Sequence, residues 1–130
     1  MTKPVKMALR VLLVTADTAL ASYIERILTQ ALGVRCVHVH SFGEASLELA
    51  QESFDVVLAE VDGSAGERLD LLNTYAPLLV LAREEARPAA RRAVVEEGAV
   101  LYMIREGLSP DTLIGAVIDA VERPGTLTSY

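Results

Sequence analysis

The chain has 130 residues, 12 of them basic and 18 acidic, so its net charge is −6. That length fits one domain with its own core, and the acidic balance, with no basic stripe along any expected helix, argues against nucleic acid as a partner. The sequence has no uninterrupted apolar run of about 18 residues, and its single cysteine allows no internal disulfide. We therefore expect a cytoplasmic protein with no membrane partner and no cofactor.

Hydrophobic residues make up 52% of the chain, yet aromatic residues make up only 5%. The core must therefore be aliphatic, which suits a parallel sheet flanked by helices. Five short apolar or alternating segments predict strands, at 9–14, 34–40, 54–60, 78–82 and 100–104.

Two helices are predicted in the first half of the chain. The first follows the turn residues 15–18, has apolar residues three and four apart from Leu20 to Ala31, and ends at Gly33. The second begins at Ser41, with Glu44 three residues later as in a capping box. The residues expected on its inner face are Ala45, Leu47, Leu49 and Ala50.

Three more helices are predicted in the second half. Ser64 and Glu67 repeat the capping spacing before a helix that ends ahead of Pro77. Its expected apolar face is Leu69, Leu71, Leu72 and Tyr75. The fourth helix runs from near Pro88 to Gly98, and the fifth follows Ser109 and continues until Pro124.

Strands that alternate with helices predict a doubly wound parallel sheet of strand order 2-1-3-4-5. We assign residues 1–125 to this domain and 126–130 to a tail or the start of a linker. The carboxyl ends of parallel strands meet at one edge, where such folds place their functional crevice. The residues expected there are Thr15, Ala16, Asp17, Glu60, Asp62, Ala82 and Arg105.

Four stretches carry a resemblance to a known family. They are RVLLVTAD from residue 10, FDVVLAE from 54, PLLVLA from 77 and LYMIREGLSPDTL from 101. In order and spacing they resemble the receiver domain of bacterial two-component response regulators, a five-stranded flavodoxin-like fold. The resemblance spans Arg10 to Arg123.

The resemblance in layout comes with a mismatch in chemistry. The resemblance places Glu60 where the family has its phosphoacceptor Asp. It places Thr15 and Ala16 where the family has the acidic pair that holds Mg²⁺, so that only the neighbouring Asp17 is acidic here. Ala82 stands in place of a Thr or Ser, and Arg105 in place of a Lys. The family's aromatic switch position is kept as Tyr102, whereas VDGSAG replaces its Pro-containing loop.

These changes predict a receiver that does not accept a phosphoryl group, because the reaction needs a metal and an acceptor placed to within about 1 Å. Glu60 and Arg105 are expected to form an ion pair instead. Two interpretations of that pair stay open. It either fixes the domain in a mimic of one signalling conformation, or it is a salt bridge that closes an obsolete pocket.

The function expected first is a pseudo-receiver that acts as a protein interaction module. An alternative is Mg²⁺-dependent phosphoryl transfer that uses Asp17, Asp62 and an unconventional acceptor. A small-molecule binder of flavodoxin-like fold ranks last, since no glycine-rich phosphate loop follows the first strand.

The resemblance also implies a face for a protein partner or a second copy, made by the fourth helix, the fifth strand and the fifth helix. Its candidate residues are Arg87, Arg91, Arg92, Tyr102, Asp119 and Arg123. The four arginines among residues 83–92 also fit an ordinary solvated loop and helix surface.

Two other features have simpler explanations. His38 and His40 share one side of a strand, but no third metal ligand is adjacent, so we expect a pair without a metal. Cys36 is expected to be a small core residue and not a nucleophile, because no His or basic cluster near it indicates a lowered pKa.

Overall fold

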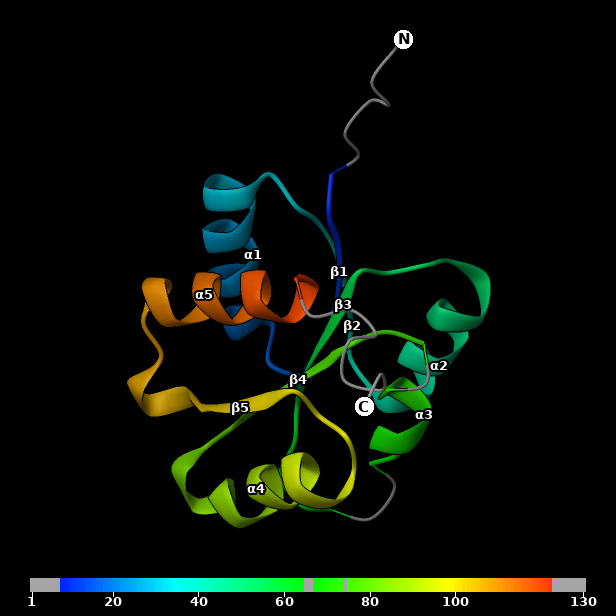
Figure 1. The fold of residues 1–130 in the computed structure, drawn as a ribbon, viewed down its shortest axis with the longest axis vertical. Helices are drawn as coiled ribbons and strands as arrows, with labels where there is room; N and C mark the ends of the chain where they lie inside the picture. The colour runs from blue at the N-terminus through cyan, green and yellow to red at the C-terminus, as the bar shows by residue number, and fades with distance from the viewer. Residues whose placement is uncertain (1–7, 65–66, 74, 123–130) are drawn as a thin grey trace, which may run out of the picture.

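The computed structural model describes residues 8–64, 67–73 and 75–122 (Figure 1). Its five strands form one parallel sheet in the order β2-β1-β3-β4-β5, so the predicted fold is confirmed. The strands are β1 (Arg10–Val14), β2 (Arg35–Val39), β3 (Val56–Glu60), β4 (Leu78–Ala82) and β5 (Leu101–Ile104). The predicted stop at Pro124, the tail 126–130, Arg123 and the side chain of Leu71 lie outside what the structure describes.

Helices cover both faces of the sheet. The helices are α1 (Thr18–Leu32), α2 (Phe42–Gln51), α3 (Leu69–Asn73), α4 (Arg87–Glu96) and α5 (Pro110–Val121). Figure 1 shows α1 and α5 together on one side of the strands, and the core divides accordingly. Residues of α2, α3 and α4 pack in a second cluster on the other face. No helix of the described part is long and apolar enough to cross a membrane.

The predicted caps at three helices are present. Asp17 accepts a hydrogen bond from the Leu20 amide at 3.1 Å, Ser41 from the Glu44 amide at 3.1 Å and Ser109 from the Thr112 amide at 3.2 Å. Each of these short side chains satisfies an amide that has no partner within its helix. The caps fix where these helices begin. Helices α1 and α2 start just after the carboxyl ends of β1 and β2, and α5 starts after the turn that follows β5.

The capping box predicted from Ser64 and Glu67 is wrong. The Glu67 carboxylate accepts hydrogen bonds from the amides of Asp62, at 2.8 Å, and Gly63, at 3.1 Å, both upstream in the chain. Because α3 begins only at Leu69 and has five residues, the free amides nearest this carboxylate are those of the loop after β3. Glu67 therefore shapes that loop.

Part of the predicted core is also wrong. Ala45 and Leu49 of α2 are buried, but Leu47 is 66% exposed, and Ala50 is exposed too. A helix advances about 100° per residue, so Leu47 lies about 200° around α2 from Ala45 and faces outward. Tyr75, predicted on the inner face of α3, is 56% exposed because that helix ends at Asn73.

This difference between Leu49 and Leu47 can be measured. Leu49→Ala should lower the free energy of unfolding by about 2–5 kcal/mol, since it leaves a cavity in the core. Leu47→Ala, the matched control on the same helix, should change it by less than about 0.5 kcal/mol. Urea unfolding of both variants tests the assignment, and equal losses would contradict it.

Candidate functional site

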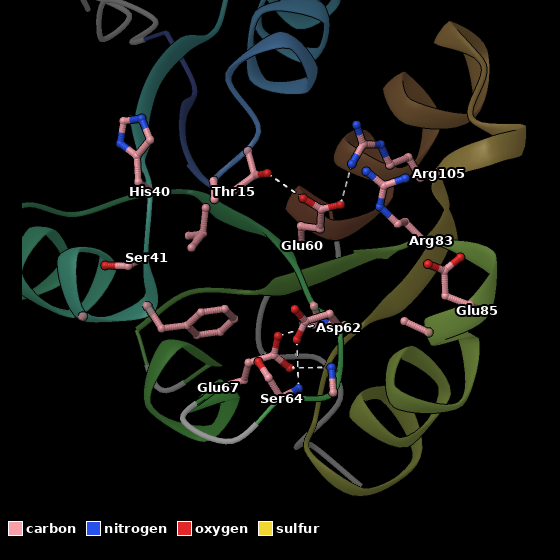
Figure 2. Close-up of a pocket in the computed structure, with 17 residues that line it drawn as sticks. Thr15, His40, Ser41, Glu60, Asp62, Ser64, Glu67, Arg83, Glu85 and Arg105 are labelled. Atoms are coloured by element: carbon pink, nitrogen blue, oxygen red, sulfur yellow. Dashed lines mark hydrogen bonds and ion pairs between the residues drawn. The ribbon is translucent and has the colours of Figure 1, made fainter.

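The carboxyl ends of the strands surround a cavity of about 780 Å³ (Figure 2). Thr15 and Ala16 reach it from the end of β1, Glu60 and Asp62 from β3, and Arg105 from the end of β5. The strands place these side chains together although 90 residues separate the first from the last in sequence numbering. The predicted crevice therefore exists.

Glu60 is held from two sides. Its Oε1 accepts a hydrogen bond from the Thr15 hydroxyl at 2.6 Å, and its Oε2 accepts one from Nη1 of Arg105 at 2.9 Å. The ion pair predicted between Glu60 and Arg105 is thus confirmed, and the Glu60 side chain is only 17% exposed. Figure 2 shows the carboxylate between its two partners, so both oxygens are engaged.

Arg105 also binds Asp17. Nη2 of Arg105 contacts Oδ2 of Asp17, and the same Asp17 caps α1 through Oδ1. The Leu20 amide and then the Arg105 guanidinium hold the pKa of Asp17 below its ordinary value of 3.8. Its hydrogen bond to Asp17 and then that to Glu60 raise the pKa of Arg105, against the effect of burial. One guanidinium therefore joins the ends of β1 and β3 to the end of β5.

Thr15 connects this network to the neighbouring strand. Its side chain is buried, and its hydroxyl oxygen accepts a hydrogen bond from the Asp17 amide at 3.0 Å while it donates to Glu60. Its carbonyl accepts a hydrogen bond from Nε2 of His38 at 2.8 Å. Since a carbonyl can only accept, His38 carries its proton on Nε2. The Thr15 hydroxyl thus donates one hydrogen bond and accepts one within the protein.

Asp62 belongs to a separate cluster in the loop after β3. Its carboxylate accepts a hydrogen bond from the Ser64 amide at 2.8 Å, and hydrogen bonds from Ser64 lower its pKa. Burial raises the pKa of the neighbouring Glu67, the opposite direction. Figure 2 shows these three side chains grouped away from Glu60. Asp62 lines the cavity without joining the Glu60 network.

The remaining predicted positions lie apart from the cavity or bring no functional group to it. Ala16 is exposed at the cavity wall, and Ala82 is fully buried below it. Tyr102, in β5, packs against the α4 side of the core and its hydroxyl contacts Arg87 at 3.4 Å. Further residues, which were not predicted, line the cavity after β2 and β4. They include His40, Ser41, Phe42, Arg83 and Glu85.

The rule that strand ends meet at one edge would have found these residues, because each follows the carboxyl end of a strand. The same rule placed Thr15, Asp17, Glu60 and Arg105 at one edge, but it did not indicate that Thr15 would bond Glu60 or that Asp17 would bond Arg105. These two contacts join residues 45 and 88 positions apart.

The predicted interaction face is partly described. Arg87 forms two hydrogen bonds to Glu84, at 2.7 and 2.8 Å, whereas Arg91 and Arg92 are exposed and unpaired within the described residues. These three arginines, with Pro88 and Glu96, line a shallow groove of about 340 Å³ on α4. Asp119 is half-buried in α5, and Arg123 lies outside the described residues.

His38 and His40 lie side by side, and Cys36 is partly buried against the core. The rings of His38 and His40 are in contact at a tilt of 44°, with centroids 4.5 Å apart. Within residues 8–64, 67–73 and 75–122, no three His, Cys, Asp or Glu side chains are grouped so that they could hold a metal ion. Burial raises the pKa of Cys36 to about 11, which keeps its thiol protonated and unreactive.

The residues of the crevice do not fit the Mg²⁺ that the resemblance implies. Mg²⁺ needs oxygen ligands in near-octahedral geometry. Ala16 offers no side-chain oxygen, the Thr15 hydroxyl is used, and Asp17 is paired with Arg105. Both Glu60 oxygens are also engaged, so a metal would have to break the network before it could bind.

No protein-family model matches the chain, and a comparison with curated proteins finds no match. Solved structures do match. The receiver domain of sensor histidine kinase PA1611 from Pseudomonas aeruginosa PAO1, with magnesium in its active-site cleft, aligns over 89% of this chain and 99% of its own, with TM-score 0.75 and 16% identity.

Two more structures are similar. Chemotaxis protein CheY4 from Vibrio cholerae is 18% identical, with TM-score 0.75 over 88% of this chain and 99% of its own. HP1043, an orphan response regulator of H. pylori, is 20% identical, with TM-score 0.74 over 87% and 96%. The chain therefore has the fold of two-component receiver domains.

The variant Asp17→Asn tests the ion pair between Asp17 and Arg105 at the N-terminus of α1. Asparagine can still cap the helix, but it has no charge. A folded-state pKa below the unfolded one contributes stability above the unfolded value, near 3.8, and loses it as the pH falls through the folded value. The variant should therefore be less stable than the parent at pH 6, and this difference should disappear in strong acid.

Urea unfolding at several pH values measures it. The matched control, Glu25→Gln in the exposed part of α1, should change the unfolding free energy by less than about 0.5 kcal/mol at each pH. A difference for Asp17→Asn that does not depend on pH would contradict the ion pair.

Proposed function

We propose that this protein is a pseudo-receiver, a domain of receiver fold that does not accept a phosphoryl group and works as a protein interaction module in two-component-type signalling. The observation that carries the proposal is the double engagement of Glu60, by Thr15 and by Arg105. At the end of β3 both carboxylate oxygens are used. The domain is then a signalling component and not an enzyme.

Physical chemistry supports this proposal. Phosphoryl transfer depends on positioning and on neutralisation of charge by metal ions and donors. The cationic group nearest the Glu60 carboxylate, Arg105, already neutralises that carboxylate and Asp17. The hydrogen bonds from Thr15 and Arg105 make the Glu60 carboxylate less nucleophilic and fix its orientation, and no set of metal ligands surrounds it within the described residues.

The two alternatives receive less support. As an unconventional acceptor, Asp17 would have to leave both Arg105 and the cap of α1, whereas Asp62 is held by the Ser64 amide outside the Glu60 network. A small-molecule binder would use the cavity of about 780 Å³. No observation on the cavity walls selects a ligand class, so we do not propose one.

We further propose that the network holds the domain in one state. Glu60, Arg105 and Asp17 connect three elements by direct contacts between their side chains. Ala82 lacks the hydroxyl that could relay a change from the crevice to Tyr102, and the Tyr102 hydroxyl contacts Arg87 of α4. Of the two interpretations of the ion pair, this favours a fixed signalling conformation.

The partner is proposed to dock on the face made by α4, β5 and α5. The unpaired Arg91 and Arg92 and the groove on α4 give this face a cationic part, which fits a protein partner that carries carboxylates. Because Tyr102 borders the same face, docking would report the fixed state without phosphorylation.

Incubation with Mg²⁺ and acetyl phosphate should leave the intact mass of the protein unchanged. Glu60→Asp by itself should also stay unlabelled, because the shorter side chain restores an acceptor but no metal ligands. Labelling should appear only when Asp is introduced at positions 15, 16 and 60 together. Intact-mass spectrometry follows all three proteins.

A gain of one phosphoryl group by the unmodified chain would overturn the proposed function. Labelling of Glu60→Asp without the other two changes would show that the metal ligands matter less than the acceptor. Circular dichroism of the triple variant checks that it is folded, so that a missing label is informative.

Charge reversal should disturb the partner face. Arg91→Glu combined with Arg92→Glu should weaken capture of the partner protein, most strongly at low salt, where exposed charges are less screened. The matched control is Arg26→Glu, an exposed arginine of α1 on the other side of the sheet. Quantitative affinity capture with an identified partner measures this, and equal capture by both variants would rule out the face.

A further inference from the structure

The layer formed by α2, α3 and α4 exposes apolar side chains that the monomer does not use. Among the described residues, the exposed large hydrophobic side chains are Leu47, Tyr75, Val95 and Ile118. The first three belong to this layer, because Leu47 is in α2, Tyr75 follows α3 and Val95 is in α4. Val95 is the most exposed, at 72%.

Leu47 and Val95 point away from the core of their own subunit. In α2 the buried residues are Ala45 and Leu49, and in α4 they are Ala90 and Ala93. A helix turns by about 100° per residue. Leu47 therefore lies on the side of α2 opposite its buried residues, and Val95 lies on the side of α4 opposite its buried residues. Each helix thus presents one large apolar side chain outward.

The two outer helices of the layer carry opposite charge. α2 contains Glu44 and Glu48 and no basic residue, whereas α4 contains three arginines and one glutamate. Within the described residues Arg91 and Arg92 have no ion-pair partner. Between these helices, at α3, Arg68 and Asp70 pair with each other at 3.3 Å. The layer therefore changes from acidic at α2, through neutral at α3, to basic at α4.

We propose that this layer binds the same layer of a second copy, face to face. The crossovers of the sheet place α3 between α2 and α4, since these helices follow β2, β3 and β4 in turn. A two-fold axis that lies in the contact plane and runs along α3 turns the second layer over, so that α4 of each copy faces α2 of the other. Arginines then meet glutamates, and Leu47 and Val95 become covered by the same contact.

The charges of the layer favour a second copy of the chain over nucleic acid or a membrane. A chain of net charge −6 repels nucleic acid and anionic membranes at long range, so the arginines of α4 favour a local contact with carboxylates. A second copy supplies those carboxylates on α2 together with an exposed leucine. This inference does not rest on the proposed function, and it shares only α4 with the partner face. Self-association and partner docking would therefore exclude each other.

Sedimentation velocity of the full chain from about 1 µM to about 1 mM tests the inference. The unmodified protein should pass from monomer to dimer in this range. Leu47→Lys and Val95→Glu should each raise the dimer dissociation constant at least about tenfold, because each places in the contact a charge that repels the helix facing it. Ile118→Glu on α5 and Arg26→Glu on α1 are matched controls that should leave it unchanged.

A mixing experiment then identifies the pairing. One chain carries Arg91→Glu with Arg92→Glu, and the other carries Glu48→Lys. Each should fail to dimerise by itself, because like charges then meet at both contacts. Their mixture should dimerise, since the introduced acids face the introduced lysine at one contact and the original charges meet at the other.

A monomer at all concentrations would overturn the inference. So would dimerisation that the α2 variants leave unchanged, or a mixture that stays monomeric while the unmodified chain dimerises. Circular dichroism of every variant excludes unfolding as the cause. The phosphorylation assay is independent of these outcomes, so the two proposals can fail separately.

Discussion

The crevice depends on one carboxylate that is bonded at both oxygens. Glu60 ends the central strand β3, with the Thr15 hydroxyl on one side and the Arg105 guanidinium on the other. Arg105 in turn binds Asp17, which caps α1. These contacts connect β1, β3, β5 and α1 through side chains alone. Because a half-satisfied buried network costs stability, the members depend on one another.

Under the proposed function, this arrangement accounts for a receiver fold that does not accept a phosphoryl group. The two hydrophobic clusters lie on the faces of the sheet, and neither contains the crevice residues Glu60 and Arg105. The fold can therefore tolerate changes at the strand ends as long as the charges there are compensated. Arg105 compensates two carboxylates, Glu60 and Asp17, within the protein. The proposed function therefore relies on the outer surface, above all on α4.

Sequence patterns predicted the elements well, because their signals are local. The bounds of β4 at 78–82 and the caps at Asp17, Ser41 and Ser109 follow from neighbouring residues. Predictions failed where a local pattern had a competing outcome, as when Glu67 bonded loop amides in place of a helix cap. The contact of Asp17 with Arg105 spans 88 positions, and only the assembled sheet brings these side chains together.

A double-mutant cycle on Glu60 and Arg105 tests the central claim most directly. The free energies of unfolding of Glu60→Gln, Arg105→Met and the combined variant would be measured in urea at pH 7. Removal of Arg105 leaves the half-buried carboxylate uncompensated, so the combined change should cost less than the sum of the single changes, by about 0.5–3 kcal/mol. Single costs that add to within about 0.3 kcal/mol would contradict the account, because Glu60 and Arg105 would then be energetically independent.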